Sequence, residues 1–167
     1  MMLRRTMVLV VALAGSMACA SESYSPPEGG AWQLARVYLS PTGPFREATG
    51  VTVFACNLAE TQHRLQLYAE KVRPGALYSV WIVTMDGNKV ASTWEATSRW
   101  RPLRADAQGV VAFVSNLPWC PVGRDVVVVK YHPSGVNRGF WGGITVLKGY
   151  LRTMEETSEP ADGGGTG

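Results

Sequence analysis

After its first twenty residues, the two most strongly apolar stretches of this chain are Leu77-Tyr78-Ser79-Val80-Trp81-Ile82-Val83 and Val126-Val127-Val128-Val129. Both are rich in the β-branched and aromatic residues that favour strands, and both are apolar at nearly every position. A strand of this kind is covered on its two faces, so we predict that both stretches are central strands. In contrast, Arg64-Leu65-Gln66-Leu67-Tyr68-Ala69 alternates between polar and apolar residues, which predicts a strand with one solvated face.

Short apolar runs of the same type recur along the chain, separated by turn residues such as Asp86-Gly87-Asn88, a strong hairpin signal. The only stretch with a helical pattern is short, around Glu60–His63. We therefore predict an all-β domain, an immunoglobulin-like two-sheet β-sandwich of about eight strands with Tyr78 and Trp81 as its inward aromatic residues. The strands are expected at Trp32–Leu39, Val51–Leu58, Arg64–Val72, Leu77–Met85, Lys89–Trp94, Val110–Ser115, Asp125–His132 and Ile144–Leu151.

The first twenty residues are typical of an export signal. Arg4 and Arg5 precede an apolar run, Met7–Ala14, that is too short to span a membrane, and small residues follow it. Two processing routes are open. Gly15-Ser16-Met17-Ala18-Cys19 resembles a bacterial lipobox, in which Cys19 is the lipid-attachment residue. Ala18-Cys19-Ala20 also fits ordinary signal peptidase, which would leave Ser21 first and secrete the protein.

Residues 21–152 divide into a tether and one domain. The Pro- and Gly-containing segment 21–30 (SESYSPPEGG) is predicted to be a flexible linker, and 31–152 is the predicted β-sandwich domain. The acidic, Gly-rich tail 153–167 is predicted to be disordered. An exported protein meets an oxidising compartment, so Cys56 and Cys120 are expected to form a disulfide, although two buried free thiols remain the alternative.

From Leu67 to Leu151 the order of motifs resembles one family. The matching motifs are Pro74-Gly75-Ala76-Leu77-Tyr78-Ser79-Val80-Trp81-Ile82-Val83, Asp86-Gly87, Ala105-Asp106-Ala107-Gln108-Gly109, Val126–Val129, His132-Pro133-Ser134-Gly135 and Gly143-Ile144-Thr145-Val146-Leu147-Lys148-Gly149. The family is the extracytoplasmic β-sandwich of anti-sigma-K-type membrane regulators. The resemblance implies an immunoglobulin-like sandwich outside the membrane. It does not imply sigma inhibition, because an export signal and a tether stand here in place of a sigma-binding segment and a membrane helix.

Composition and motif spacing argue against most chemical functions. A net charge of +3 spread over predicted strands and turns does not favour a nucleic-acid partner. His63 and His132 are too far apart for a zinc motif, so we interpret them as surface histidines, with a copper site joining both to a methionine as an alternative. No nucleophile elbow or phosphate loop is present, and we expect neither an enzyme nor a bound cofactor.

Aromatic residues near predicted strand ends are the one pattern that favours binding. Trp and Arg dominate interaction hot spots, although large residues at sheet ends also seal small cores. We predict a contact surface at Trp94, Arg99, Trp100, Arg101, Arg104, Phe140 and Trp141. The expected function is a non-catalytic interaction or structural module that is lipid-anchored in the periplasm or at the cell surface, or secreted. Its partner would be an envelope protein or, alternatively, a glycan or other envelope polymer, and it would meet membrane only through lipid on Cys19.

Overall fold

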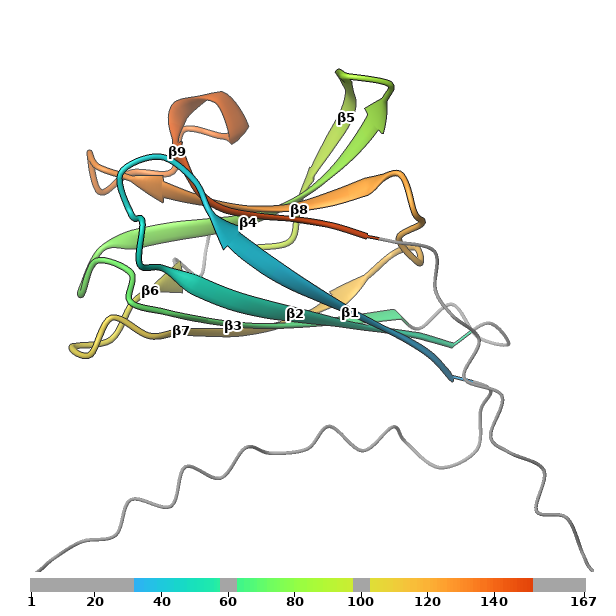
Figure 1. Ribbon diagram of the computed structural model, residues 1–167, viewed down its shortest axis with the longest axis horizontal. Coiled ribbons are helices and arrows are strands. Elements are labelled where there is room, and N and C mark those ends of the chain that lie inside the picture. Colours follow the sequence, from blue (N-terminus) through green and yellow to red (C-terminus); the bar gives the residue numbers. More distant parts are fainter. Residues whose placement is uncertain (1–31, 58–62, 98–102, 152–167) are drawn as a thin grey trace, which may run out of the picture.

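The fold was analysed in a computed structural model, which describes residues 32–57, 63–97 and 103–151. Within these ranges the chain forms nine strands in one antiparallel sheet and a single short 3-10 helix (Figure 1). The elements are β1 (Trp32–Pro41), β2 (Thr49–Asn57), β3 (His63–Glu70), β4 (Leu77–Asp86), β5 (Lys89–Glu95), β6 (Leu103–Arg104), β7 (Val111–Leu117), β8 (Asp125–His132), η1 (Phe140–Gly142) and β9 (Ile144–Tyr150). The prediction of an all-β domain is therefore confirmed.

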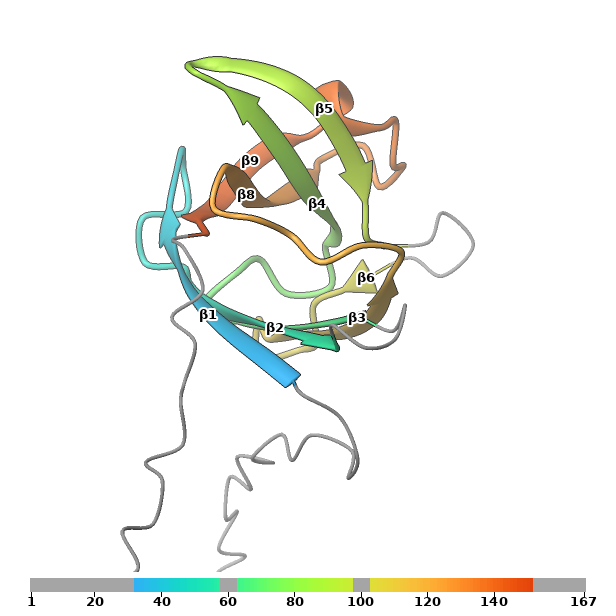
Figure 2. The ribbon, with the colours of Figure 1, turned by 90° about the vertical axis from the view of Figure 1, so that its right-hand side faces the viewer.

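The sheet is continuous and strongly curled. Its hydrogen-bonded order is β5-β4-β8-β9-β1-β2-β3-β7, with β6 paired to the start of β4. Figure 2 shows the curl end-on, with β1, β2 and β3 on one side and β4, β8 and β9 on the other. Strand β1 makes the turn between the two halves, because it pairs with β2 along nearly its whole length but with β9 only at Ser40 and Pro41.

The main core fills the space between the two halves. Tyr78, Phe54, Leu65 and Val129 are among its fully buried side chains. The halves approach closely where β9 crosses β1, and there only glycine fits. A Cβ on Gly149 would lie 2.6 Å from Val37 Cγ1 and 2.7 Å from the Tyr38 carbonyl oxygen, distances at which one of the two strands would have to move.

Strands β4 and β8 are buried on both faces, as their unbroken apolar sequences predict. Their outward side chains form a second apolar cluster, which comprises Trp81, Val83, Val126 and Val128. The expectation that Trp81 belongs to the main core is therefore wrong. Residues 78 and 81 are three positions apart, and because side chains alternate along a strand, Tyr78 points inward and Trp81 outward.

All eight expected strands are present, and their ends lie within two residues of the predicted ones. The two-residue strand β6 was not predicted, since a run this short carries no periodicity. The expected helical stretch ends at His63, which is the first residue of β3, and its other residues lie outside the described ranges. The export signal with Cys19, the 21–30 linker and the 153–167 tail also lie outside them. None of the described helical residues forms a segment long and apolar enough to cross a bilayer.

A disulfide ties β2 to the β7–β8 connection at one end of the sheet. Cys56, near the end of β2, is bonded to Cys120, which precedes β8, and their Cα atoms are 5.6 Å apart. The bond closes a loop with a sequence separation of 64 residues. This pairing agrees with the expected disulfide, and it is consistent with an oxidising compartment.

Candidate functional site: the Phe140–Trp141 loop

The β8–β9 connection, residues 133–143, carries two of the predicted contact residues on the outer side of β4 and β8. The Phe140 ring packs edge-on against Trp81, with 5.5 Å between ring centroids. Trp141 packs edge-on against Phe140 at 5.0 Å. Trp141 is nevertheless 81% exposed, whereas Phe140 is half-buried over the second apolar cluster. The loop thus uses one aromatic ring as an anchor and presents the next one to solvent.

Lys130 contacts the loop from the outer face of β8. Its side chain is only 6% exposed, and its Nζ donates a hydrogen bond of 3.1 Å to the Gly143 carbonyl oxygen. The same ammonium lies 4.3 Å from the centroid of the Phe140 ring, within the range of a cation–π contact. Burial lowers the pKa of the Lys130 ammonium. A desolvated cation placed between a carbonyl oxygen and an aromatic face fixes the position of both.

A chain of buried hydrogen bonds lies beside Lys130. The Trp81 indole donates to Ser79 Oγ at 2.7 Å, and Ser79 Oγ shares a hydrogen bond of 2.8 Å with His132 Nε2. His132 is 1% exposed, and its Nδ1 is buried without a hydrogen-bond partner. A Cβ on Gly143 would come within 2.9 Å of the imidazole ring, so the loop closes directly over the histidine.

The ionisation of His132 is controlled by this environment. Burial lowers its pKa most strongly, the Glu95 carboxylate raises it, and the neighbouring Lys130 ammonium lowers it again. The net direction is downward, which favours the neutral imidazole. The interpretation of His132 as a surface histidine is therefore wrong, because the loop that follows it folds back over it.

The far side of the loop is tied to the end of β5. The Asn137 side-chain amide donates to the Glu95 carboxylate, which also accepts from the Thr97 hydroxyl at 3.0 Å. Asn137 Oδ1 in turn accepts from the Gly139 backbone N–H at 2.9 Å. These hydrogen bonds fix the backbone just before η1. The loop that carries the exposed Trp141 ring is therefore held by contacts at Asn137, Phe140 and Gly143.

The other predicted contact residues lie elsewhere. Trp94 is half-buried and packs edge-on against Trp119 at 5.0 Å, where it borders the main core as a sealing residue would. Arg104 is exposed in β6, and its Nη1 donates to the Gly75 carbonyl oxygen at 3.2 Å. Arg99, Trp100 and Arg101 lie outside the described residues. The structure thus brings together Phe140 and Trp141 and separates both from Trp94.

Lys130, His132, Ser79 and Asn137, which support the loop, were not among the predicted site residues. Alternation along β8 was the available signal, because it places Lys130 and His132 on the same face as Val126 and Val128. The alternation does not predict where the loop lies. The loop covers this face through contacts with residues distant in sequence.

The two histidines are not brought together for a metal. His63 pairs with Cys56 at the disulfide end of the sheet, whereas His132 ends β8 at the opposite end. Within the described ranges, no group of three or more His, Cys, Asp or Glu side chains is placed to hold a metal ion.

Neither the protein-family models nor the curated proteins include a match to this chain.

Proposed function

We propose that this protein is a non-catalytic, exported interaction module of the bacterial envelope, and that the Phe140–Trp141 loop is its contact site for an envelope protein. The observation that carries the proposal is the 81% exposure of Trp141 on a loop whose neighbouring residues are fixed. A large aromatic ring already held in place loses little conformational entropy on binding, and tryptophan is enriched in interaction hot spots.

The chemistry around Trp141 describes the partner surface. Within the loop, Val136 is an exposed apolar residue and Arg138 is an exposed cation. The loop sequence from Pro133 to Gly143 contains no acidic residue. A complementary partner would offer an apolar slot for the indole ring, bordered by carboxylates.

Two observations support the absence of catalysis. Ser79 and His132 are paired at hydrogen-bond distance, but both side chains are buried under the loop. A nucleophile and its base need access to a substrate, and here the Ser79 hydroxyl already accepts a hydrogen bond from Trp81. This arrangement is better explained as a structural support for the loop.

For the fold, we propose that the two halves of the curled sheet correspond to an immunoglobulin-like sandwich, like that of the anti-sigma-K-type regulators. The support is that the core lies between the halves and that β1 and β9 pair at only two positions. A crystal structure in which β1 and β9 pair along their whole lengths and the edge strands β5 and β7 also pair would instead describe a closed barrel, and it would contradict this assignment.

Site-specific photo-crosslinking tests the contact site. A photoreactive phenylalanine analogue is placed at position 141 of the exported protein, and as a matched control at Val90, which is exposed on β5. We expect a discrete adduct with an envelope protein from position 141 and none from position 90. Equal labelling from both positions, or none from 141, would contradict the proposal.

The alternative, a glycan-binding module, calls for a platform of exposed aromatic rings. Among the tryptophan side chains that the structure describes, Trp141 alone is exposed, since Trp81 is buried and Trp94 and Trp119 pack on each other. Co-sedimentation with purified envelope polysaccharide tests this alternative. Binding that is lost in Trp141→Ala would replace the protein partner with a glycan.

A further inference from the structure

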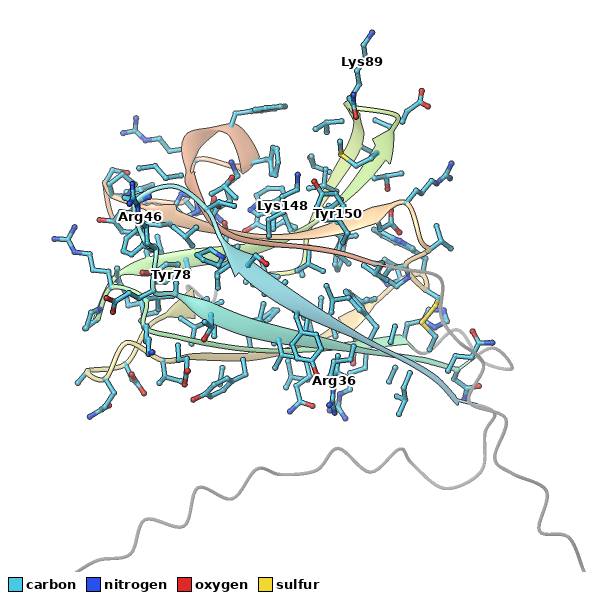
Figure 3. All side chains as sticks on the ribbon, viewed as in Figure 1. Arg36, Arg46, Tyr78, Lys89, Lys148 and Tyr150 are labelled. Atoms are coloured by element: carbon cyan, nitrogen blue, oxygen red, sulfur yellow. A yellow bond between two sulfur atoms is a disulfide. The ribbon has the colours of Figure 1, made fainter. Side chains whose placement is uncertain are left out.

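The outer face of β1, β2, β3 and β7 is a second surface, which we call the open face. It consists of the outward side chains of these strands and includes Tyr38 (72% exposed), Val114 (51% exposed), Tyr68 and Leu34. Figure 3 shows Arg36 projecting from this face, on the side of the molecule opposite to Lys148 and Tyr150. The open face is independent of the Phe140–Trp141 loop, which lies on the outer side of the other half.

Strand pairing arranges the open face in four parallel rows that cross the strands. From one end of the strands to the other, the rows are Thr49 with Glu70; Tyr38, Val51, Tyr68 and Ala112; Arg36, Val53, Gln66 and Val114; and Leu34, Ala55, Arg64 and Asn116. The two middle rows are largely apolar or aromatic. The cations Arg36 and Arg64 stand on one side of the midline between the middle rows, and the anion Glu70 stands on the other.

We propose that the open face binds the same face of a second copy of this chain, about a two-fold axis that runs across the strands between the two middle rows. Such an axis superposes each strand on its own copy in the opposite direction. Each row therefore faces the row of the second copy that lies at the same distance on the other side of the midline. Every contact occurs twice. The polar residues are distributed so that this particular arrangement is self-complementary.

Three oppositions follow from the rows. Arg64 faces Glu70 of the second copy, which forms two ion pairs per dimer. Glu70 is held in place for this role, because its carboxylate accepts hydrogen bonds from the Thr49 and Tyr68 hydroxyls. Arg36 faces Tyr38 of the second copy, the geometry of a cation–π contact. The third opposition sets Val51 against Val53 of the second copy in the apolar centre.

The shape of the open face also fits the proposed dimer. A shallow depression on the open face is lined by Val53, Ala55, Arg64 and Gln66. The axis places Tyr68 of the second copy over this depression. Four strands spaced about 4.8 Å apart and seven residues long present roughly 500 Å² per copy. Twice this area is near the lower limit for a specific interface, so the dimer is expected to dissociate reversibly on dilution.

Sedimentation velocity of the purified protein over a wide concentration range tests the proposal. We expect a monomer–dimer equilibrium that weakens as salt is added, because the paired charges lie near the rim of the interface. A protein that stays monomeric at its highest soluble concentration would overturn the proposal. A monomer whose open face instead captures lipid vesicles or envelope polysaccharide would also overturn it.

Charge reversal tests the register. Arg64→Glu sets two carboxylates against each other twice per dimer and is expected to raise the dimer dissociation constant at least about tenfold. The double variant Arg64→Glu/Glu70→Arg restores opposite charges and is expected to return the constant to within about threefold of the wild-type value. Failure of the second exchange to rescue the first would contradict this register.

Two control variants separate this proposal from the proposed function. Lys89→Glu reverses a charge at the exposed start of β5, away from the open face (Figure 3), and should leave the dimer unchanged. Trp141→Ala removes the contact ring on the other half and should also leave the dimer unchanged. A dimer abolished by Trp141→Ala would place the interface on the loop and overturn the open-face assignment. Absence of crosslinks from position 141 would contradict the proposed contact site but not the open-face dimer.

Discussion

The two outer faces of the curled sheet differ in whether a loop covers them. The hydrophobic patterns of the strands beneath them differ accordingly. The outer side of β4 and β8 is covered by the 133–143 loop, with Phe140 over Trp81 and Val128 packed beside it. The open face on β1, β2, β3 and β7 keeps Tyr38 and Val114 exposed. The covered strands contain the continuous apolar runs 80–83 and 126–129, whereas β3 alternates because its second face is exposed in the monomer.

The two faces also carry two kinds of exposed aromatic residue. Trp141 stands on a fixed loop above a covered face, and Tyr38 stands in a flat row of an uncovered one. A single fixed ring suits insertion into a slot, whereas a flat row suits another flat surface.

Removing the central aromatic residue of the covered face should have the largest effect on stability. Trp81→Ala deletes a buried ring together with its hydrogen bond to Ser79, and it should lower the free energy of unfolding by about 3–5 kcal/mol. Tyr38→Ala on the open face should cost less than about 1 kcal/mol when the chain is diluted to a monomer. Urea denaturation measures both values, and equal losses would abolish the distinction between the faces.

The disulfide ties β2, which bears part of the open face, to the connection that leads from β7 to β8. Replacing Cys56 and Cys120 with serine should lower the free energy of unfolding by up to about 4 kcal/mol, because the unfolded chain regains the freedom of a long loop. Denaturation with and without reductant measures this difference in the wild type. A double-serine variant that reductant still destabilises would show that another thiol contributes.

Acidification should weaken the covered face through His132. Because its pKa is lowered in the folded protein, the unfolded state binds the proton first. The stability it contributes is therefore present above pH about 6.5 and is lost as the pH falls through that value toward the folded pKa. Thermal unfolding of wild type and His132→Gln between pH 8 and pH 5 should converge on acidification. Curves that stay parallel over this range would refute the assignment.

The smallest expected effect separates the anchor of the loop from its contact ring. Phe140→Ala should cost about 2 kcal/mol of unfolding free energy, since the ring packs on Trp81 and Lys130. Trp141→Ala should change it by less than about 0.5 kcal/mol, because that ring is almost fully solvated. Chemical denaturation of the two variants compares them directly. A large loss in Trp141→Ala would assign that ring a structural role.

Sequence reasoning located most of the fold and about half of the candidate site. Strand positions follow from β-branched runs and turn residues, which act locally, and Phe140 and Trp141 stood out as large aromatic residues between glycines. Trp94 belonged to the same pattern but seals the core beside Trp119. Whether an aromatic residue is buried depends on neighbours distant in sequence, and a list of residue types does not contain them.

The amino-acid sequence alone was enough to predict that this chain forms strands, which strands are central and which are half-exposed, and it favoured a disulfide between Cys56 and Cys120. These properties depend on alternation, turn chemistry and cysteine count, all of which are local or compositional. The folded structure was needed to show that Trp81 faces outward, that the 133–143 loop buries His132, and that the open face carries its charges on opposite sides of a midline. These features depend on strand register and loop placement, which long-range packing alone selects.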